Sequence, residues 1–203
     1  MTDVSGRHEV PVIAIDGPSG SGKGTICRLL ADTLGWHLLD SGALYRVTAL
    51  AAIRAGVDIS EEIKIASLAA ELPVVFDDNM DGNERILLAG HDITSDVRSE
   101  TCGEYASQVA ALPAVREALV ARQLAFAQSP GLVADGRDMG TEIFPRAPLK
   151  IFLTASAAER AERRYKQLKD NNIDVSLPAL LRDIEQRDQR DASRSLSPLR
   201  PAS

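Results

Sequence analysis

Four glycines and a lysine stand close together near the start of the chain, in the segment GPSGSGKGT from Gly17 to Thr25. Glycines let the backbone curl so that successive N–H groups point inward and surround an anion. Lys23 adds a positive charge that can reach the outer phosphates of a nucleotide. The segment fits the pattern G-x-x-x-x-G-K, with Gly24 in the place usually held by serine or threonine. It therefore predicts a loop that binds a triphosphate.

Two further groups of polar residues follow apolar runs and can hold a second anion. Ser41 and Arg46 stand in the segment DSGALYR, and Arg137 and Asp138 follow a run that ends at Asp135. Arginine suits this task because its planar fork grips phosphate and carboxylate groups. A carboxylate such as Asp135 is often placed near magnesium in folds that carry a phosphate loop. Taken alone, the first group also fits a helix cap with a surface arginine, and the second fits a salt bridge in a turn.

Charged residues also share a face on each of two predicted helices late in the chain. Residues spaced by three, four or seven positions lie on one side of a helix. Such patterns are typical of solvated ion pairs, and each helix taken alone indicates no more than that. The residues are Arg160, Arg163 and Arg164 on the first helix and Arg187, Asp191 and Arg194 on the second.

The elements that position these groups predict an α/β fold. Apolar runs without alternation predict central parallel strands at residues 10–16 and 131–135, and shorter strands at 36–40 and 149–154. A helix is expected after each of the first two strands along the chain. This alternation predicts a doubly wound parallel sheet with helices on both faces. Because ligands of such sheets bind beyond the carboxyl ends of the strands, the phosphate loop and residues 40–42 should face one crevice.

A different pattern interrupts the α/β alternation in the middle of the chain. Residues 73–77 and 84–90 read as an antiparallel hairpin, and residues 91–95 lead into a third strand or a helix cap. We therefore expect a small insert at about 68–107, between core segments 1–67 and 108–203. Helices are expected after it at 99–112 and 114–128.

The last third of the chain predicts two charged helices. Ser156 and Glu159 form the spacing of a capping box, which opens the first of them. A polar stretch at 169–174 ends this helix, and a second one covers about 178–194. We expect the region of about 156–190 to form a helical lid.

Composition limits the function classes. The 203 residues are 44% hydrophobic and 26% charged, and the formal net charge is −6, which argues against broad binding of nucleic acid. No apolar run approaches the ~18 residues of a membrane span, and the polar N-terminus does not resemble a signal peptide. The two cysteines, Cys27 and Cys102, predict neither a disulfide framework nor a metal site. We expect a cytoplasmic monomer that binds no membrane.

Several motifs together resemble the bacterial cytidylate kinases, members of the nucleoside-monophosphate kinase family. The chain carries, in the order of that family, IDGPSGSGKGT, LLDSGALYR, SQVAALPAVREALVARQ, ADGRDMGT, IFLTAS followed by ERAERR, and RDQRDASR. The ending GKGT is also the form found in adenylate kinase and its relatives. The resemblance covers nearly the whole chain, although the family usually continues past the PLRP segment with another strand and a helix. It implies a P-loop fold with a nucleoside-monophosphate-binding insert, and transfer of the γ-phosphoryl group of ATP to CMP or dCMP with Mg²⁺.

The resemblance also implies roles for individual residues. The ATP phosphates are expected at Gly17, Pro18, Ser19, Gly20, Ser21, Gly22, Lys23, Gly24 and Thr25, with Arg163 and Arg164 on the lid helix. CMP is expected to be read by Ser41, Arg116 and Asp138 at the base, by Ser107, Arg187 and Asp191 at the sugar, and by Arg46, Arg137 and Arg194 at the phosphate. Lys23, Arg137 and Arg194 are the expected catalytic residues, and Thr25 and Asp135 are expected near Mg²⁺ without a firm direct ligand.

The chemistry of the acceptor agrees with this set of residues. A phosphate monoester is mostly dianionic at neutral pH because its second pKa is about 6, so it has no proton to give up and needs no general base. The alternatives that the residues leave open are a kinase for UMP or AMP, a nucleotide-binding module without catalysis, and a small-metabolite kinase with Asp40 or Asp138 as base. The chain lacks the Asn/Thr-Lys-x-Asp motif of a GTPase.

Overall fold

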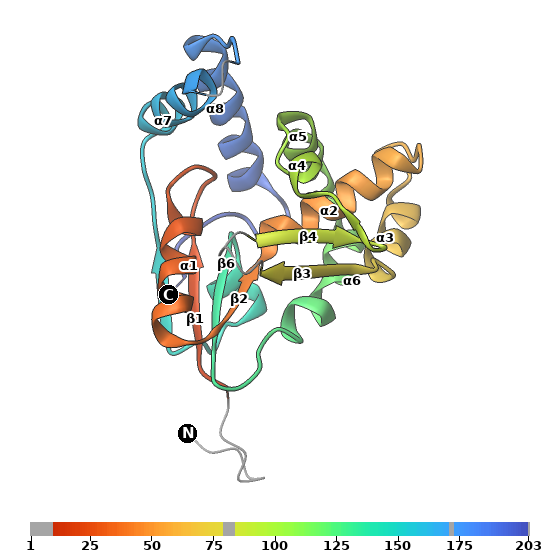
Figure 1. Cartoon of the computed structure of the whole chain (residues 1–203), viewed down its shortest axis with the longest axis vertical. Coiled ribbons are helices and arrows are strands. Elements are labelled where there is room, and N and C mark those ends of the chain that lie inside the picture. The colour runs from red at the N-terminus through yellow and green to blue at the C-terminus, as the bar shows by residue number, and fades with distance from the viewer. Residues whose placement is uncertain (1–9, 79–83, 171–172, 203) are drawn as a thin grey trace. The chain divides into compact units, whose positions relative to one another are not determined.

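The computed structural model describes residues 10–78, 84–170 and 173–202. In these ranges the chain forms two compact units, divided after Asp40 and before Gln123. The first unit contains residues 10–40 and 123–202, and the second contains residues 41–122. Figure 1 shows the elements of both units with their labels.

The first unit is built on a parallel sheet of four strands in the order β2-β6-β1-β7. Its central strands are buried along their whole length, as expected for near-continuous apolar runs in a parallel sheet. The elements of this unit are the strands β1 (Val12–Asp16), β2 (His37–Asp40), β6 (Leu132–Gly136) and β7 (Leu149–Phe152), the helices α1 (Lys23–Leu34), α7 (Ala157–Asp170) and α8 (Leu177–Ser193), and one π-helical turn, η1 (Met139–Ile143).

Helix α1 packs on the sheet through a small apolar core. Cys27 and Ala31 of α1 meet Ile13, Ile15 and Val133 of the two central strands. The helix ends as the sequence predicts, because Gly35 adopts a left-handed conformation (φ 62°) and its N–H caps the last carbonyls. This packing fixes the start of α1 beside the carboxyl ends of β1 and β6.

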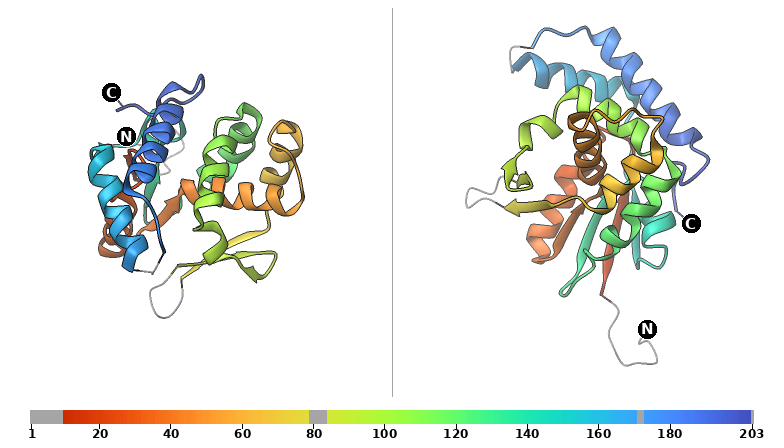
Figure 2. Two further views of the ribbon diagram at one scale, coloured as in Figure 1. Left: turned by 90° about the horizontal axis from the view of Figure 1, so that it is seen from above. Right: turned by 90° about the vertical axis from the view of Figure 1, so that its right-hand side faces the viewer.

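Helices α7 and α8 lie side by side at the end of the first unit, as both views of Figure 2 show. The predicted capping box opens α7: the Ser156 hydroxyl accepts from the Glu159 N–H (3.2 Å), and the Glu159 carboxylate accepts from the Ser156 N–H (2.9 Å). These two helices carry most of the charged residues of the last third of the chain.

The second unit surrounds helix α2 (Ser41–Arg54), which is buried on most of its surface. A helix apolar nearly all round is expected at the centre of a unit. It contacts α3 (Glu62–Ala70), α4 (Thr94–Val97) and α5 (Glu100–Val109). The unit also holds most of α6 (Pro113–Leu124) and an antiparallel sheet of β3 (Val74–Asp78), β4 (Glu84–Leu88) and β5 (His91–Asp92).

The predicted parallel α/β sheet and the antiparallel hairpin are confirmed. The expected hairpin turn falls on residues 79–83, and part of the polar break after α7 on residues 171–172, which lie outside the described residues. Residues 91–95 form both of the expected alternatives, the short strand β5 and the start of α4. The second compact unit includes the predicted insert at 68–107 and extends beyond it on both sides.

Helix α2, expected after the second strand along the chain, begins at Ser41, directly after β2. A helix at Glu62–Ala70 was not foreseen, because its apolar residues do not form a wide stripe and Ile63 is exposed.

Candidate active site

The loop between β1 and α1 has the backbone expected of an anion nest. Gly20 (φ 76°) and Gly22 (φ 95°) adopt left-handed conformations, and Gly22 is the N-cap of α1. A Cβ atom at Gly17 would lie 2.0 Å from the carbonyl oxygen of Leu153, so this position requires glycine. The Ser21 hydroxyl is buried and has no hydrogen-bond partner in the described part of the chain. The loop therefore offers N–H groups and one buried hydroxyl to a phosphate at a helix N-terminus.

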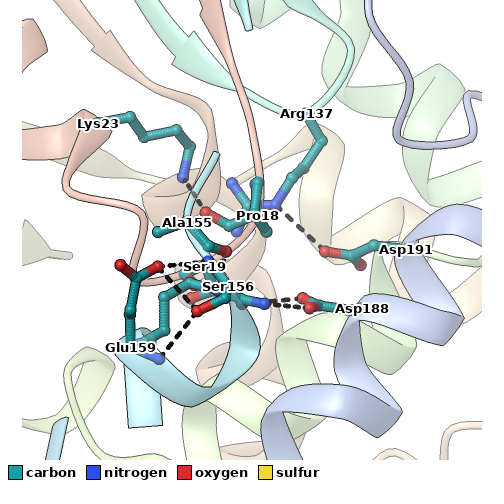
Figure 3. A network of polar contacts seen from close by, with 10 residues as sticks. Pro18, Ser19, Lys23, Arg137, Ala155, Ser156, Glu159, Asp188 and Asp191 are labelled. Carbon is teal, nitrogen blue, oxygen red and sulfur yellow. Dashed lines mark hydrogen bonds and ion pairs between the residues drawn. The ribbon is translucent and has the colours of Figure 1, made fainter. Parts of the chain in front are cut away.

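Lys23 lies at the start of α1 and is only 7% exposed. Its ammonium group donates to the Pro18 carbonyl (3.3 Å; Figure 3). It also lies 3.6 Å from Oδ1 of Asp135. Burial, together with the positive charge of Arg137, lowers the pKa of Lys23 to about 8, although Asp135 acts in the opposite direction. A phosphate anion beside Lys23 would favour the protonated form again.

Asp135 lies near the end of β6 and faces the first turn of α1. Burial raises the pKa of Asp135 to about 6, and Lys23 acts in the opposite direction. A Cβ atom at Gly24 would lie 3.3 Å from Oδ2 of this carboxylate. The glycine after Lys23 therefore gives Asp135 the room that a serine or threonine would reduce.

Cys27, one turn further along α1, is fully buried. Burial raises the pKa of its thiol, so the group stays protonated. Cys27 is therefore an inert residue of the apolar core.

Asp16 ties the end of β1 to η1, the turn that follows Arg137 and Asp138. Its two carboxylate oxygens accept the backbone N–H groups of Met139 and Gly140, both at 2.8 Å. Asp16 is 3% exposed, and burial raises its pKa while the two hydrogen bonds lower it. The clamp fixes the backbone directly after Asp138, which is itself buried at 3% exposure. Asp16 was not predicted to be a site residue, although it stands at the end of a predicted central strand.

Arg137 projects from the end of β6 toward α8. Its Nε donates to Oδ2 of Asp191 (3.2 Å; Figure 3). Its Nη1 donates to the Gly136 carbonyl (3.0 Å). These contacts use two of the five N–H groups of the guanidinium. Two of the predicted site residues, Arg137 and Asp191, are thus in contact, with Arg187 on the same helix as Asp191 and Arg194 at its C-cap.

Arg160 contradicts the expectation that the α7 arginines form solvated ion pairs. Its side chain is 3% exposed and binds the carboxylate of Asp188 on α8 through both Nη atoms. It also donates to the carbonyls of Ser19 and Ala155, each at 3.0 Å. Arg163 is exposed as expected, and Arg164 donates to Gln167 (2.7 Å). Helical spacing alone could not show that Arg160 has a partner 28 residues away.

The other predicted residues lie in the second unit. Arg46 of α2 donates to the Val97 carbonyl (2.8 Å), and its guanidinium crosses Gly103 of α5. A Cβ atom at Gly103 would lie 3.0 Å from both Nη atoms of Arg46. The glycine therefore permits the close approach of α5 that fixes this arginine.

Arg116 of α6 is buried at 8% exposure. It donates to the Ala110 carbonyl (3.1 Å) and stands 5.7 Å from the centre of the Tyr45 ring, a distance at which the cation attracts the ring face. Ser41 and Ser107 are also buried in this unit, at 3% and 4% exposure. Four of the predicted residues thus belong to the second unit, and the phosphate loop with the remaining ones belongs to the first.

No group of three or more His, Cys, Asp or Glu side chains in the described residues is arranged to hold a metal ion by itself. Oxygen-bearing side chains at the loop include the carboxylate of Asp135, beside Lys23, and the hydroxyl of the exposed Thr25. This sparse set fits Mg²⁺, which is commonly bound by one or two protein groups together with substrate phosphates and water. Among the same residues, no helix has the length and apolar character needed to cross a bilayer.

Comparison with known proteins agrees with this geometry. The sequence model of the family described as cytidylate kinase matches residues 13–203. A cytidylate kinase of Pseudomonas fluorescens is 61% identical over 195 residues, which cover 96% of this chain and 85% of the relative. That of Colwellia psychrerythraea is 56% identical over 196 residues, covering 97% of this chain and 87% of the relative. That of Shewanella denitrificans is 58% identical over 196 residues, covering 96% and 86%.

Proposed function

Because the chain belongs to the cytidylate kinase family, we propose that it transfers the γ-phosphoryl group of ATP to CMP or dCMP. The observation that carries the proposal is the joint placement of a phosphate loop with Lys23 and of the Arg137–Asp138 segment at the carboxyl ends of neighbouring strands. Ligands of parallel sheets bind at these ends.

The phosphate loop holds the donor. The N–H groups of residues 17–25, the Ser21 hydroxyl and the Lys23 ammonium bind the ATP phosphates, and Arg163 and Arg164 approach ATP from α7. Thr25 and Asp135 would lie near Mg²⁺ bound together with the ATP phosphates, and the metal would supply positive charge that neutralises the transferring group. The negative phosphates favour the charged form of Lys23, so ATP binding offsets part of the free energy cost of its burial.

The residues proposed for the acceptor are those that the resemblance to the family implies. Asp138 accepts from the 4-amino group of cytosine while Arg116 and Ser41 bind other polar atoms of the base. Uracil has an acceptor in place of that amino group, so a carboxylate there discriminates against it. The sugar is held by Ser107, Arg187 and Asp191, and the phosphate by Arg46, Arg137 and Arg194.

Catalysis in this proposal depends on alignment and charge. The dianionic phosphate of CMP attacks in line and has no proton to lose, so none of the residues acts as general base. The guanidinium of Arg137 offsets the repulsion between the two anions and retains N–H groups that can turn to phosphate. Cytoplasmic location and a monomeric state stay predictions.

The experiment that tests the proposal compares substrate dependence in Asp138→Asn, measured by CMP-dependent release of ADP. The amide has the size of the carboxylate but presents one acceptor, so we expect the KM for CMP to rise about tenfold or more while the KM for ATP changes less than about twofold. Glu142→Gln, an exposed change on η1, is the matched control. Equal effects of Asp138→Asn on both substrates would remove Asp138 from the base-binding site.

A further inference from the structure

Arg160 contacts the phosphate loop in two ways. Its Nη1 atom donates to the carbonyl of Ser19 (3.0 Å). Its aliphatic stem lies across Gly20, where an added Cβ would be 3.6 Å from Cβ and 3.8 Å from Cγ and Cδ of Arg160. The side chain therefore restrains the backbone at Ser19 and packs over Gly20 in the middle of the loop.

The same guanidinium holds α8. Both carboxylate oxygens of Asp188 accept from Arg160, in the fork-to-fork arrangement that gives arginine–carboxylate pairs their directional strength (Figure 3). The Arg160 side chain is 3% exposed and that of Asp188 is 30% exposed. A pair this buried is screened little by solvent, so its geometry is retained better than that of a surface ion pair.

Asp188 and Asp191 lie three residues apart on α8, and hence on neighbouring positions of one face. Asp188 binds Arg160, and Asp191 binds Arg137 at the end of β6. Two ion pairs one turn apart thus connect α8 to the phosphate loop through Arg160 and to the acceptor-side segment through Arg137. The set of Arg160, Asp188, Asp191 and Arg137 is called the α8 bridge below.

We propose that Arg160 is a positioning residue that couples the ATP site to the CMP site through the α8 bridge. ATP binding orders the phosphate loop. Because Arg160 contacts both this loop and Asp188, the order extends to α8, the helix that carries Arg187, Asp191 and Arg194. The inference rests on the proposed function, because it takes those α8 residues as ligands of CMP. In this proposal Arg160 acts through its contacts with the loop and with α8 and is not assigned as a ligand of either substrate.

Coupling of this kind is a ratio of affinities. If the bridge connects the sites, saturation of the ATP site strengthens CMP binding by some factor, and CMP strengthens ATP binding by the same factor. Factors of about 5 to 150 are typical of coupled sites. Loss of the bridge should lower the factor while each substrate alone still binds, because the groups that touch the substrates remain.

The experiment measures the Kd of CMP by calorimetry with and without a saturating, non-hydrolysable ATP analogue and Mg²⁺. Arg160→Met keeps the stem over Gly20 and removes the fork, and it leaves Asp188 partly in contact with water. We expect the coupling factor to fall at least fivefold in this variant, with the Kd of CMP alone within twofold of the unchanged chain. Lys166→Met, an exposed cation removed from the same helix, is the control and should keep the full factor.

Two further variants separate coupling from a general loss of structure. Asp188→Asn should reduce the factor as Arg160→Met does, and the double variant should lose no more than either single one. Asp188→Glu keeps a carboxylate and should restore most of the factor. If Arg160→Met unfolds below the assay temperature, Arg160→Lys, which keeps the charge but not the fork, decides the question.

The inference is overturned if Arg160→Met and Asp188→Asn keep the coupling factor of the unchanged chain, or if the unchanged chain shows no coupling at all. Failure of the proposed function is a separate result, since it would appear as absence of CMP-dependent ADP release in the unchanged chain before any variant is made.

Discussion

Buried carboxylates at the ends of two central strands determine the local chemistry of the site. Asp16 and Asp135 both have pKa values raised by burial, yet they have different partners. Asp16 accepts two backbone N–H groups, whereas Asp135 faces the ammonium of Lys23. The carboxylate of Asp16 therefore fixes the backbone of η1, and the carboxylate of Asp135 balances the positive charge of Lys23 in the phosphate loop.

Asp16→Asn tests the backbone role. The amide offers one acceptor in place of two, and its NH₂ group would face a backbone N–H. We expect the free energy of unfolding to fall by about 2 kcal/mol and the KM for CMP to rise more than that for ATP. Urea titration and steady-state kinetics measure the two effects, with the exposed Asp32→Asn on α1 as control. A change in stability no larger than that of the control would refute the clamp.

Asp135→Asn tests the raised pKa of this residue by the pH dependence of stability. Between the ordinary value of 3.8 and about 6, folded Asp135 holds a proton that the unfolded chain has released. The free energy of unfolding of the unchanged chain should therefore fall, relative to the variant, as pH rises through this window. The relative slope is at most about 1.4 kcal/mol per pH unit, and it vanishes above the window.

Urea unfolding of both proteins without nucleotide, at several pH values from 4 to 7.5, measures this difference. A relative stability that rises with pH would mean that the pKa is lowered in the folded protein, contrary to the burial of Asp135.

At the scale of elements, the junction between β1 and the phosphate loop is packed closely against the backbone that follows β7. The N–H of Leu153, just after β7, donates to the Asp16 carbonyl (2.8 Å), and Gly17 lies against the Leu153 carbonyl. The β1 strand thus passes into the phosphate loop at a point where two backbones touch. Side chains cannot relieve a clash between backbones, so this junction tolerates no change of size.

Gly17→Ala should lower the free energy of unfolding by about 3 kcal/mol or more, because the added Cβ has no room beside Leu153. Gly35→Ala is the matched control, since Gly35 also has a positive φ of 62° but no heavy atom within 4 Å of an added Cβ. We expect about 1 kcal/mol for the control, from backbone strain alone. Thermal unfolding of both variants measures the difference, and equal losses would contradict the clash.

Most of the first unit could be predicted from the sequence because its elements have strong local signals. The buried strands are continuous apolar runs, Gly35 ends α1, and Ser156 with Glu159 opens α7. The helix at Glu62–Ala70 and the π-helical turn η1 were not predicted, since neither has a clear period or cap in the sequence. Helix α5 was predicted with its start one residue and its end three residues from the observed bounds, and the hairpin strands with end points shifted by at most two residues.

In the candidate site, too, groups of residues adjacent in the sequence could be predicted, whereas contacts between distant residues could not. The phosphate loop could be predicted because Gly17 to Thr25 are adjacent and their pattern has a mechanism. The pairing of Arg160 with Asp188 could not, because it depends on how α7 packs against α8. The contact of Asp16 with η1 likewise joins residues more than 120 positions apart.

At the scale of the whole molecule, the function depends on the positive charge of Lys23, which the fold holds in place before the substrate binds. Lys23→Met should lower kcat by about 100-fold or more, because it removes a charge aimed at the transferring phosphate. The Kd of CMP alone should change less than about twofold, and circular dichroism should show a folded chain. Near-normal turnover would refute the assignment of the loop.

The central claim is that the chain phosphorylates cytidine monophosphates with ATP. It is tested most directly by the initial rate of ADP release with Mg²⁺-ATP and, in turn, CMP, dCMP, UMP, AMP and GMP at equal concentration. We predict that CMP and dCMP give the high rates and that ATP alone gives almost none. Equal rates with UMP or AMP, or no dependence on any monophosphate, would contradict the claim.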